Sequence, residues 1–172
     1  MISFNLYLER REDVIKPQQT SGEKVGISQW SAIVLETLRA GSLSDERILA
    51  LLREGDVDSL PSLPDKLNYD ELLELARTDW ETVRSAVSEG YRIKYNTIYG
   101  IRTLLKLKYE AEANLVYEQG EGYLDQIRLT DAQLEEFRSS LSAYWSITDQ
   151  EPPADGRRLV RIELGKINGN PE

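Results

Sequence analysis

Signals that start helices recur along this chain at short intervals, and they favour a fold built from several short helices. Asn68, Thr78 and Thr130 each stand three residues before a Glu or Gln. In this arrangement the two side chains satisfy free N–H groups in the first helical turn. Leucines flank the signals at Asn68 and Thr130, where they can pack across the start of the helix. We expect helices at 69–77, 79–89, 97–110 and 131–145.

The N-terminal third of the chain also shows helical periodicity. Apolar side chains recur at helical spacing after Ser28, which can cap a helix, and Gly41 can end that helix. A second helix is expected to begin at Ser44 and to end before Gly55. The segment 56–65 contains two prolines, and we interpret it as a linker.

Strand-like alternation appears at both ends of the chain and once near its middle. Residues 2–8 and 158–164 alternate apolar with polar side chains, which is the period of a half-buried strand. Residues 114–118 and 123–129 flank the turn sequence QGEG and predict a β-hairpin. Two polar stretches are interpreted as loops, at 16–26 and 148–156.

These elements together predict an α+β fold that is mostly helical and has a small antiparallel sheet. We expect an N-terminal strand with a helical hairpin at 1–57, a central unit of helices and a β-hairpin at 66–148, and a C-terminal strand at 156–167 that packs back on the core. A chain of 172 residues can bury roughly 70% of its unfolded surface, so one compact domain is expected overall.

Two residue types are absent from the sequence, and both are important in catalysis. Without histidine the chain lacks the commonest general base and every histidine-based metal site. Without cysteine it lacks a thiolate nucleophile and any disulfide. No intact catalytic motif replaces them. We therefore expect a protein that is not an enzyme and that uses no cofactor and no metal.

The chain also lacks membrane signals. Its start, MISFNLYLERRED, has no cationic segment followed by a long apolar run, as a signal peptide would. No stretch approaches the roughly 18 apolar residues that a transmembrane helix needs. We expect a soluble, cytoplasmic protein without a membrane partner.

A basic segment interrupts this acidic chain, whose formal net charge is −9. Residues 90–109, GYRIKYNTIYGIRTLLKLKY, carry five positive charges and no Asp or Glu. On a helix over 98–109, apolar side chains form one face. Lys108 falls on this apolar side, where its ammonium group must reach water or a carboxylate. The opposite, polar face consists of Tyr99, Arg102, Thr103 and Lys106.

The order of three helices followed by a β-hairpin, over 69–129, resembles the winged helix-turn-helix family of DNA-binding proteins. Ala86 and Gly90 also stand four residues apart, as Ala and Gly do in many helix-turn-helix units. The turn YRIKYN departs from this pattern because it exceeds the usual three to four or so residues and can form a short strand. The QGEG wing is acidic, which is unfavourable near phosphate. The resemblance implies a DNA partner, read by Tyr99, Arg102, Thr103 and Lys106, with Arg92 and Lys94 holding phosphates.

Other interpretations of the charge pattern stay open. The cations can simply be solvated beside the acidic segments 44–82 and 110–136. Alternatively, the chain is a small acidic protein-binding module, such as an inhibitor, an immunity protein or an antitoxin-like protein. Its helices at 69–89 or 131–145 would then cover a basic partner protein. A homodimer is also possible, because tryptophans on the expected helices can anchor a core or a subunit interface.

Four tyrosines alternate with the cations of the basic segment: Tyr91, Tyr95, Tyr99 and Tyr109. If they are exposed, their rings can stack on nucleic-acid bases. If they are half buried, only their hydroxyls reach water. We favour the half-buried arrangement on sequence alone.

Overall fold

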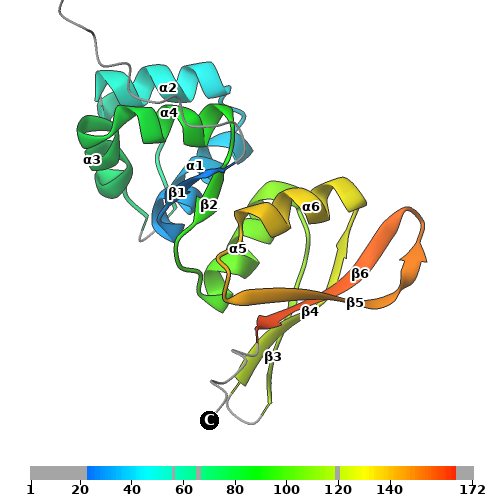
Figure 1. Ribbon diagram of the computed structural model, residues 1–172. Helices are drawn as coiled ribbons and strands as arrows, with labels where there is room; N and C mark the ends of the chain where they lie inside the picture. The colour runs from blue at the N-terminus through cyan, green and yellow to red at the C-terminus, as the bar shows by residue number, and fades with distance from the viewer. Residues whose placement is uncertain (1–22, 56, 65–66, 119–120, 166–172) are drawn as a thin grey trace, which may run out of the picture.

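A computed structural model of the protein describes residues 23–55, 57–64, 67–118 and 121–165, and it has an α+β fold, as expected (Figure 1). The strand expected at 2–8 lies outside the described residues. None of the helices in these ranges is long and apolar enough to cross a membrane.

The first part of the fold is a group of helices beside a small parallel sheet. In chain order its elements are β1 (Val25–Ile27), α1 (Gln29–Ala40), α2 (Asp45–Glu54), a 3-10 turn (Val57–Ser59), α3 (Asp70–Thr78), α4 (Trp80–Ser88) and β2 (Tyr91–Ile93). Strands β1 and β2 pair in parallel, with Val25 opposite Tyr91. The expectation of a loop at 16–26 was therefore wrong for its last two residues, which belong to β1. A three-residue strand is too short to show a period, and its partner lies far along the chain.

The second part is a four-stranded antiparallel sheet with two helices. Its elements are α5 (Ile98–Tyr109), β3 (Asn114–Glu118), β4 (Glu121–Leu129), α6 (Asp131–Ser140), β5 (Trp145–Ala154) and β6 (Arg157–Leu164). The strand order is β3-β4-β6-β5. The expected hairpin is confirmed as β3–β4, and the expected last strand is confirmed as β6, which pairs with both β4 and β5. The hairpin is thus the edge of a larger sheet rather than a separate wing.

The expectations for 131–156 were wrong in two respects. Helix α6 ends at Ser140 rather than near Trp145, and the expected loop at 148–156 is largely strand β5. Apolar and polar side chains alternate only over 145–148, and the rest of β5 is largely polar and contains two prolines, so the alternation is too short to predict the strand. It lies at the edge of the sheet, where prolines are tolerated, and its pairing with β6 is irregular.

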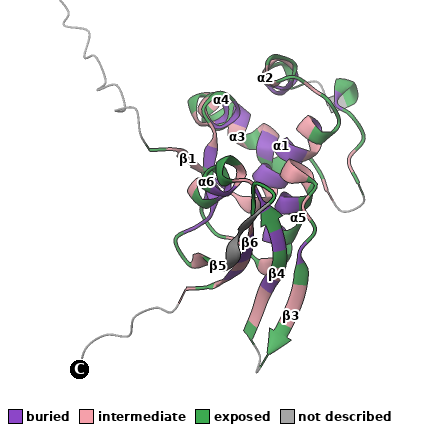
Figure 2. Ribbon diagram, turned by 90° about the vertical axis from the view of Figure 1, so that its right-hand side faces the viewer, coloured by how far each residue is buried: buried purple, intermediate pink, exposed green. Residues whose placement is uncertain are grey.

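One continuous core connects the two parts of the fold. Leu35 of α1, Leu105 of α5 and Leu124 of β4 all belong to the same cluster of buried side chains. Helices α1 and α5 pack against each other, and α5 also packs on β4. Figure 2 shows buried stretches on α1, α5 and β4, whereas the last residue of β3 and the first of β4 are exposed. The core therefore holds α5 between the helices and the sheet.

Local capping determines where most helices begin. Ser28 and Ser44 are N-caps, as expected, and Thr97 is the N-cap of α5; each side chain accepts a hydrogen bond from a backbone N–H of the first turn. Thr130 forms a complete capping box with Gln133. The capping signals at Asn68 and Thr78 predicted the helix starts one residue too early. The N-caps of α3 and α4 are Tyr69 and Asp79.

We expect Asp79→Ala to lower the free energy of unfolding by about 1 kcal/mol, which is typical of a lost N-cap. The Asp79 carboxylate accepts hydrogen bonds from Thr82 Oγ1, at 2.7 Å, and from Thr82 N, at 3.2 Å. These hydrogen bonds hold its pKa below the ordinary 3.8. A lowered pKa contributes stability above pH 3.8 that is lost as the pH falls through the folded-state value.

The matched control is Thr78→Ala, one residue away. The Thr78 hydroxyl only donates to Glu74 O within its own helix, at 2.8 Å, so its loss should change stability little. Urea unfolding at neutral pH compares the two variants. An equal loss of stability in both variants, or a larger one for Thr78→Ala, would indicate that Thr78 rather than Asp79 caps α4.

Candidate nucleic-acid interface

The first turn of α5 is attached to α1 through Gln29. Thr97 caps the helix by accepting from Gly100 N at 3.1 Å, and Thr97 N donates to Gln29 Oε1 at 2.7 Å. A Cβ atom on Gly100 would stand 2.0 Å from the Gln29 side chain, so glycine makes room for this contact. The start of α5 is therefore fixed relative to α1.

Helix α5 has the two faces that its periodicity predicts. Ile101, Leu104 and Leu105 are buried, and they pack into the core. Tyr99, Arg102, Thr103 and Lys106 are all exposed on the other side. We call these four residues the α5 outer face.

The α5 outer face borders a pocket of about 430 Å³ between the helix and the segment that follows it. Glu112 lies across this pocket and forms an ion pair with Lys106. Both side chains are more than half exposed, at 58% and 75%, so this pair is weakened by solvent and salt. The pKa of Glu112 is lowered by the hydrogen bond from Lys106 and, to a smaller extent, by the charge of Arg102. Within the described ranges, Arg102 forms no ion pair of its own.

The remaining two residues expected at the interface lie on the β2 side. Arg92 is exposed on β2, and the exposed Lys94 follows that strand, donating its backbone N–H to Ile27 O at 3.0 Å. Arg92 lines a second pocket, of about 300 Å³, together with Arg138. The structure thus brings four of the six expected residues to one pocket and leaves Arg92 and Lys94 outside it.

The tyrosines of the basic segment divide between the surface and the interior. Tyr91 is buried and Tyr109 is half buried, but both hydroxyls are buried, so the favoured arrangement with hydroxyls in water was wrong for these two residues. Tyr95 and Tyr99 are instead exposed, by 72% and 60%. Each exposed ring has a tyrosine partner that sequence reasoning missed. The partners are Tyr144, stacked on Tyr95, and Tyr117, whose hydroxyl contacts that of Tyr99.

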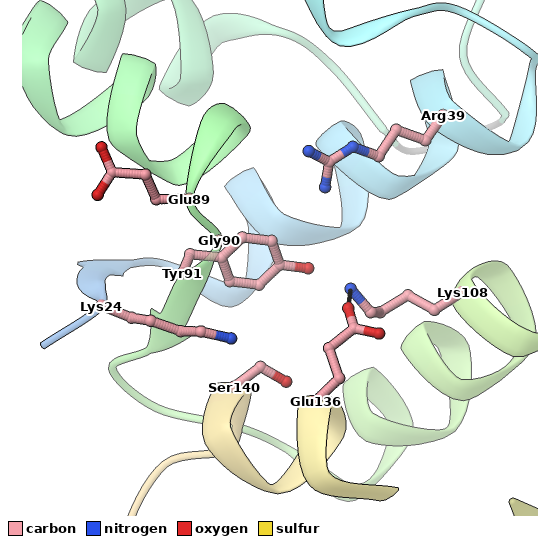
Figure 3. A pocket seen from close by; sticks show the side chains of 8 residues that line it. All are labelled: Lys24, Arg39, Glu89, Gly90, Tyr91, Lys108, Glu136 and Ser140. Atoms are coloured by element: carbon pink, nitrogen blue, oxygen red, sulfur yellow. Dashed lines mark ion pairs between the residues drawn. The ribbon is translucent and has the colours of Figure 1, made fainter. Parts of the chain in front are cut away.

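Lys108 does not belong to the exposed surface. Its side chain is only 9% exposed, and its Nζ lies 2.8 Å from a Glu136 carboxylate oxygen (Figure 3). The same Nζ lies 3.4 Å from a carboxylate oxygen of Glu36. The Tyr91 hydroxyl donates to Glu36 at 2.8 Å, and Arg39 Nη1 lies 2.9 Å from the same carboxylate. This ion cluster joins α1, β2, α5 and α6. Of the two outcomes expected for Lys108, water or a carboxylate, the structure shows the carboxylate.

The environment of the ion cluster shifts the pKa values of Tyr91 and Glu136. Burial raises the pKa of Tyr91, and the nearby Glu36 carboxylate raises it further. For Glu136, burial favours the neutral acid, but the hydrogen bond and charge of Lys108 outweigh it and lower the pKa. The charges of the cluster are thus compensated by one another, which is typical of a structural ion pair.

Comparison of the chain with protein-family models, with curated proteins and with solved structures finds no match. The order of three helices and a hairpin is present as α3, α4, α5 and β3–β4, but β2 separates α4 from α5. In the part of the chain that the structure describes, no cluster of three or more carboxylates is arranged to hold a metal ion.

Proposed function

We propose that the protein is a non-enzymatic regulatory protein that binds DNA through the α5 outer face. One observation supports this most. The four residues of that face are all exposed around one pocket, and within the described ranges Arg102 has no carboxylate partner of its own. These are the side-chain groups that contact phosphates and base edges.

The energetics of this surface favour a local, salt-sensitive contact. The formal net charge of −9 opposes indiscriminate binding, so attraction has to come from the few exposed cations. A phosphate can replace Glu112 as the partner of Lys106, since that ion pair is exposed. Arg102 can hold a phosphate through two parallel hydrogen bonds. Each contact releases counterions, so binding should weaken steeply with salt.

We expect the double reversal Arg102→Glu with Lys106→Glu to weaken DNA binding at least about tenfold at low salt. The slope of log affinity against log salt should fall by about two, one for each lost cation. The measurement is fluorescence anisotropy with labelled DNA of mixed sequence at several salt concentrations. Circular dichroism checks that the variant stays folded.

The matched control is Arg77→Glu with Arg84→Glu, which changes the net charge equally on α3 and α4. These arginines are exposed and pair with Glu74 and Glu81 one turn earlier. The control should keep most of the affinity. The proposal is wrong if the unmodified protein binds no DNA at low salt, or if both double variants lose the same affinity.

The acidic helices give less support to the protein-binding alternative. On α3, α4 and α6, exposed glutamates pair with arginines of their own helix: Glu74 with Arg77, Glu81 with Arg84, and Glu135 with Arg138. A basic partner would have to displace these arginines before it could use the carboxylates. Of the two cations of the α5 outer face, Lys106 alone has an ion pair to displace within the described ranges.

A further inference from the structure

We propose that the DNA bound by this protein is single-stranded, an inference that rests on the proposed function and specifies its ligand. The observation behind it is the pair of tyrosine contacts beside the basic segment. Within the described residues, the exposed large apolar side chains are four tyrosines and Leu164. The tyrosines are Tyr95, Tyr99, Tyr117 and Tyr144, and each contacts another member of the set.

The two contacts hold aromatic rings in place at the surface. The rings of Tyr95 and Tyr144 lie 6.1 Å apart at an interplanar angle of 14°, although the residues are 72% and 52% exposed. The hydroxyls of Tyr99 and Tyr117 lie 2.8 Å apart, and these residues are 60% and 55% exposed. A ring that is already held in place and still open to solvent loses little further conformational freedom when it stacks on a base.

Both tyrosine pairs lie at the same end of the antiparallel sheet. Tyr117 of β3 is opposite Gly122 of β4, at the hairpin end of these strands. Tyr144 directly precedes Trp145, the first residue of β5, which is opposite Leu164 at the end of β6. Neighbouring β4 and β6 meet at this end too, where Tyr123 is opposite Glu163.

The start of α5 covers this end of the sheet. A Cβ atom on Gly122 would lie 3.1 Å from Ile98 Cδ1, so the first turn of the helix is next to the hairpin. Figure 1 shows the beginning of β5 close to the same end of α5. Tyr95 and Tyr99 are four residues apart, so their Cα atoms are at most about 14 Å from each other. A short oligonucleotide can therefore reach both pairs.

Cations stand beside each tyrosine pair. Arg102 and Lys106 follow Tyr99 by about one and two helical turns on the α5 outer face. Arg92 lines its pocket with Arg138, and the two residues that flank Tyr144, Ala143 and Trp145, line it as well. Fixed aromatic rings alternating with backbone-binding cations are the arrangement that holds single-stranded nucleic acid.

A duplex uses this surface less well. In a DNA duplex the bases stack on one another and present only their edges, so a tyrosine ring finds no open base face to stack on. A recognition helix must also enter a major groove about 12 Å wide. Here Tyr117 contacts the first turn of α5, and the exposed acids Glu118 and Glu121 end and begin the adjoining strands. These acids lie beside Tyr117 and oppose phosphates of either kind of DNA, so the preference for a single strand depends on the tyrosine rings.

The test compares a labelled mixed-sequence DNA strand with the same strand annealed to its complement, by anisotropy at low salt. The unmodified protein should bind the single strand at least about tenfold more tightly than the duplex. Tyr95→Ala with Tyr144→Ala should weaken single-strand binding about tenfold, since it removes base stacking, and should leave duplex binding unchanged. Tyr95→Phe with Tyr144→Phe, which keeps the rings, should retain the single-strand affinity.

The outcomes separate this inference from the proposed function. If neither probe binds, the proposed function itself is wrong. If the duplex binds as tightly as the single strand, or if the alanine variant weakens both probes equally, DNA binding stands and the single-strand inference is overturned. Loss of affinity in the phenylalanine variant would also contradict stacking, because only the hydroxyls differ.

Discussion

Lys108→Ala should lower the free energy of unfolding by about 3–5 kcal/mol, the usual cost of removing one partner from a buried ion pair. Lys106→Ala, two residues earlier on the same helix, should change stability little. Both lysines form ion pairs with glutamates, but the Lys108 side chain is 9% exposed and that of Lys106 is 58% exposed. The comparison thus tests burial rather than residue type.

The large expected effect of Lys108→Ala follows from what the lysine leaves behind. Glu36 is 4% exposed, and it would keep only Arg39 and the Tyr91 hydroxyl as partners. With Arg39 as its one remaining cation, this buried carboxylate is less fully compensated, and its charged form becomes less stable in the folded protein. The ammonium also lies 5.5 Å from the Tyr91 ring centre, so a cation–π contact is lost at the same time.

Urea unfolding at neutral pH measures this difference between the two lysine variants. Acid titration gives a second measurement, because the pKa of Glu136 is held below its ordinary 4.5. The stability that Glu136 contributes is present above pH 4.5 and is lost as the pH falls through its lowered pKa. Lys108→Ala should remove this acid-dependent part. If Lys106→Ala lowers the free energy of unfolding as much as Lys108→Ala does, the ion cluster is not what stabilises this region.

Local signals predicted most of the helices but not the strands that depend on distant partners. A cap such as Thr130 is satisfied by groups in its own first turn, so the residues that form it are adjacent in sequence. Strand β1 is defined instead by pairing with β2, far along the chain, whereas β5 pairs with the next strand, β6, across the two-residue turn Asp155-Gly156, a local signal that sequence reasoning missed. A short strand containing glycine and a polar edge strand carry no period of their own.

The same distinction applies to the candidate site. Helical periodicity was enough to predict which face of α5 is exposed, because it depends only on spacing along one helix. Periodicity also predicted that Lys108 must find a partner. It could not identify Glu36 and Glu136, or pair Tyr95 with Tyr144, because those contacts join residues far apart in the chain.

Phe137→Ala should also cost about 3–5 kcal/mol, as expected when a large core side chain leaves a cavity. Phe137 is fully buried, and its ring meets that of Tyr109 edge to face, with 5.8 Å between centres. Phe137→Leu, which fills most of the space, should cost less than about 1.5 kcal/mol. Urea unfolding measures both, and equal losses would mean that the aromatic contact rather than the cavity dominates.

Phe137 and Lys108 should not act independently. The Tyr109–Phe137 ring contact and the Lys108–Glu136 ion pair join neighbouring residues of the same two helices, α5 and α6. Once either contact is removed the helices can separate, so the second removal costs less than it does alone. The double variant Lys108→Ala with Phe137→Ala should therefore lose less stability than the sum of the single losses, by roughly 1–3 kcal/mol. If the stability losses of the two single variants are additive, each contact holds α6 to α5 independently of the other. The α5 outer face would then keep its position after either contact is lost.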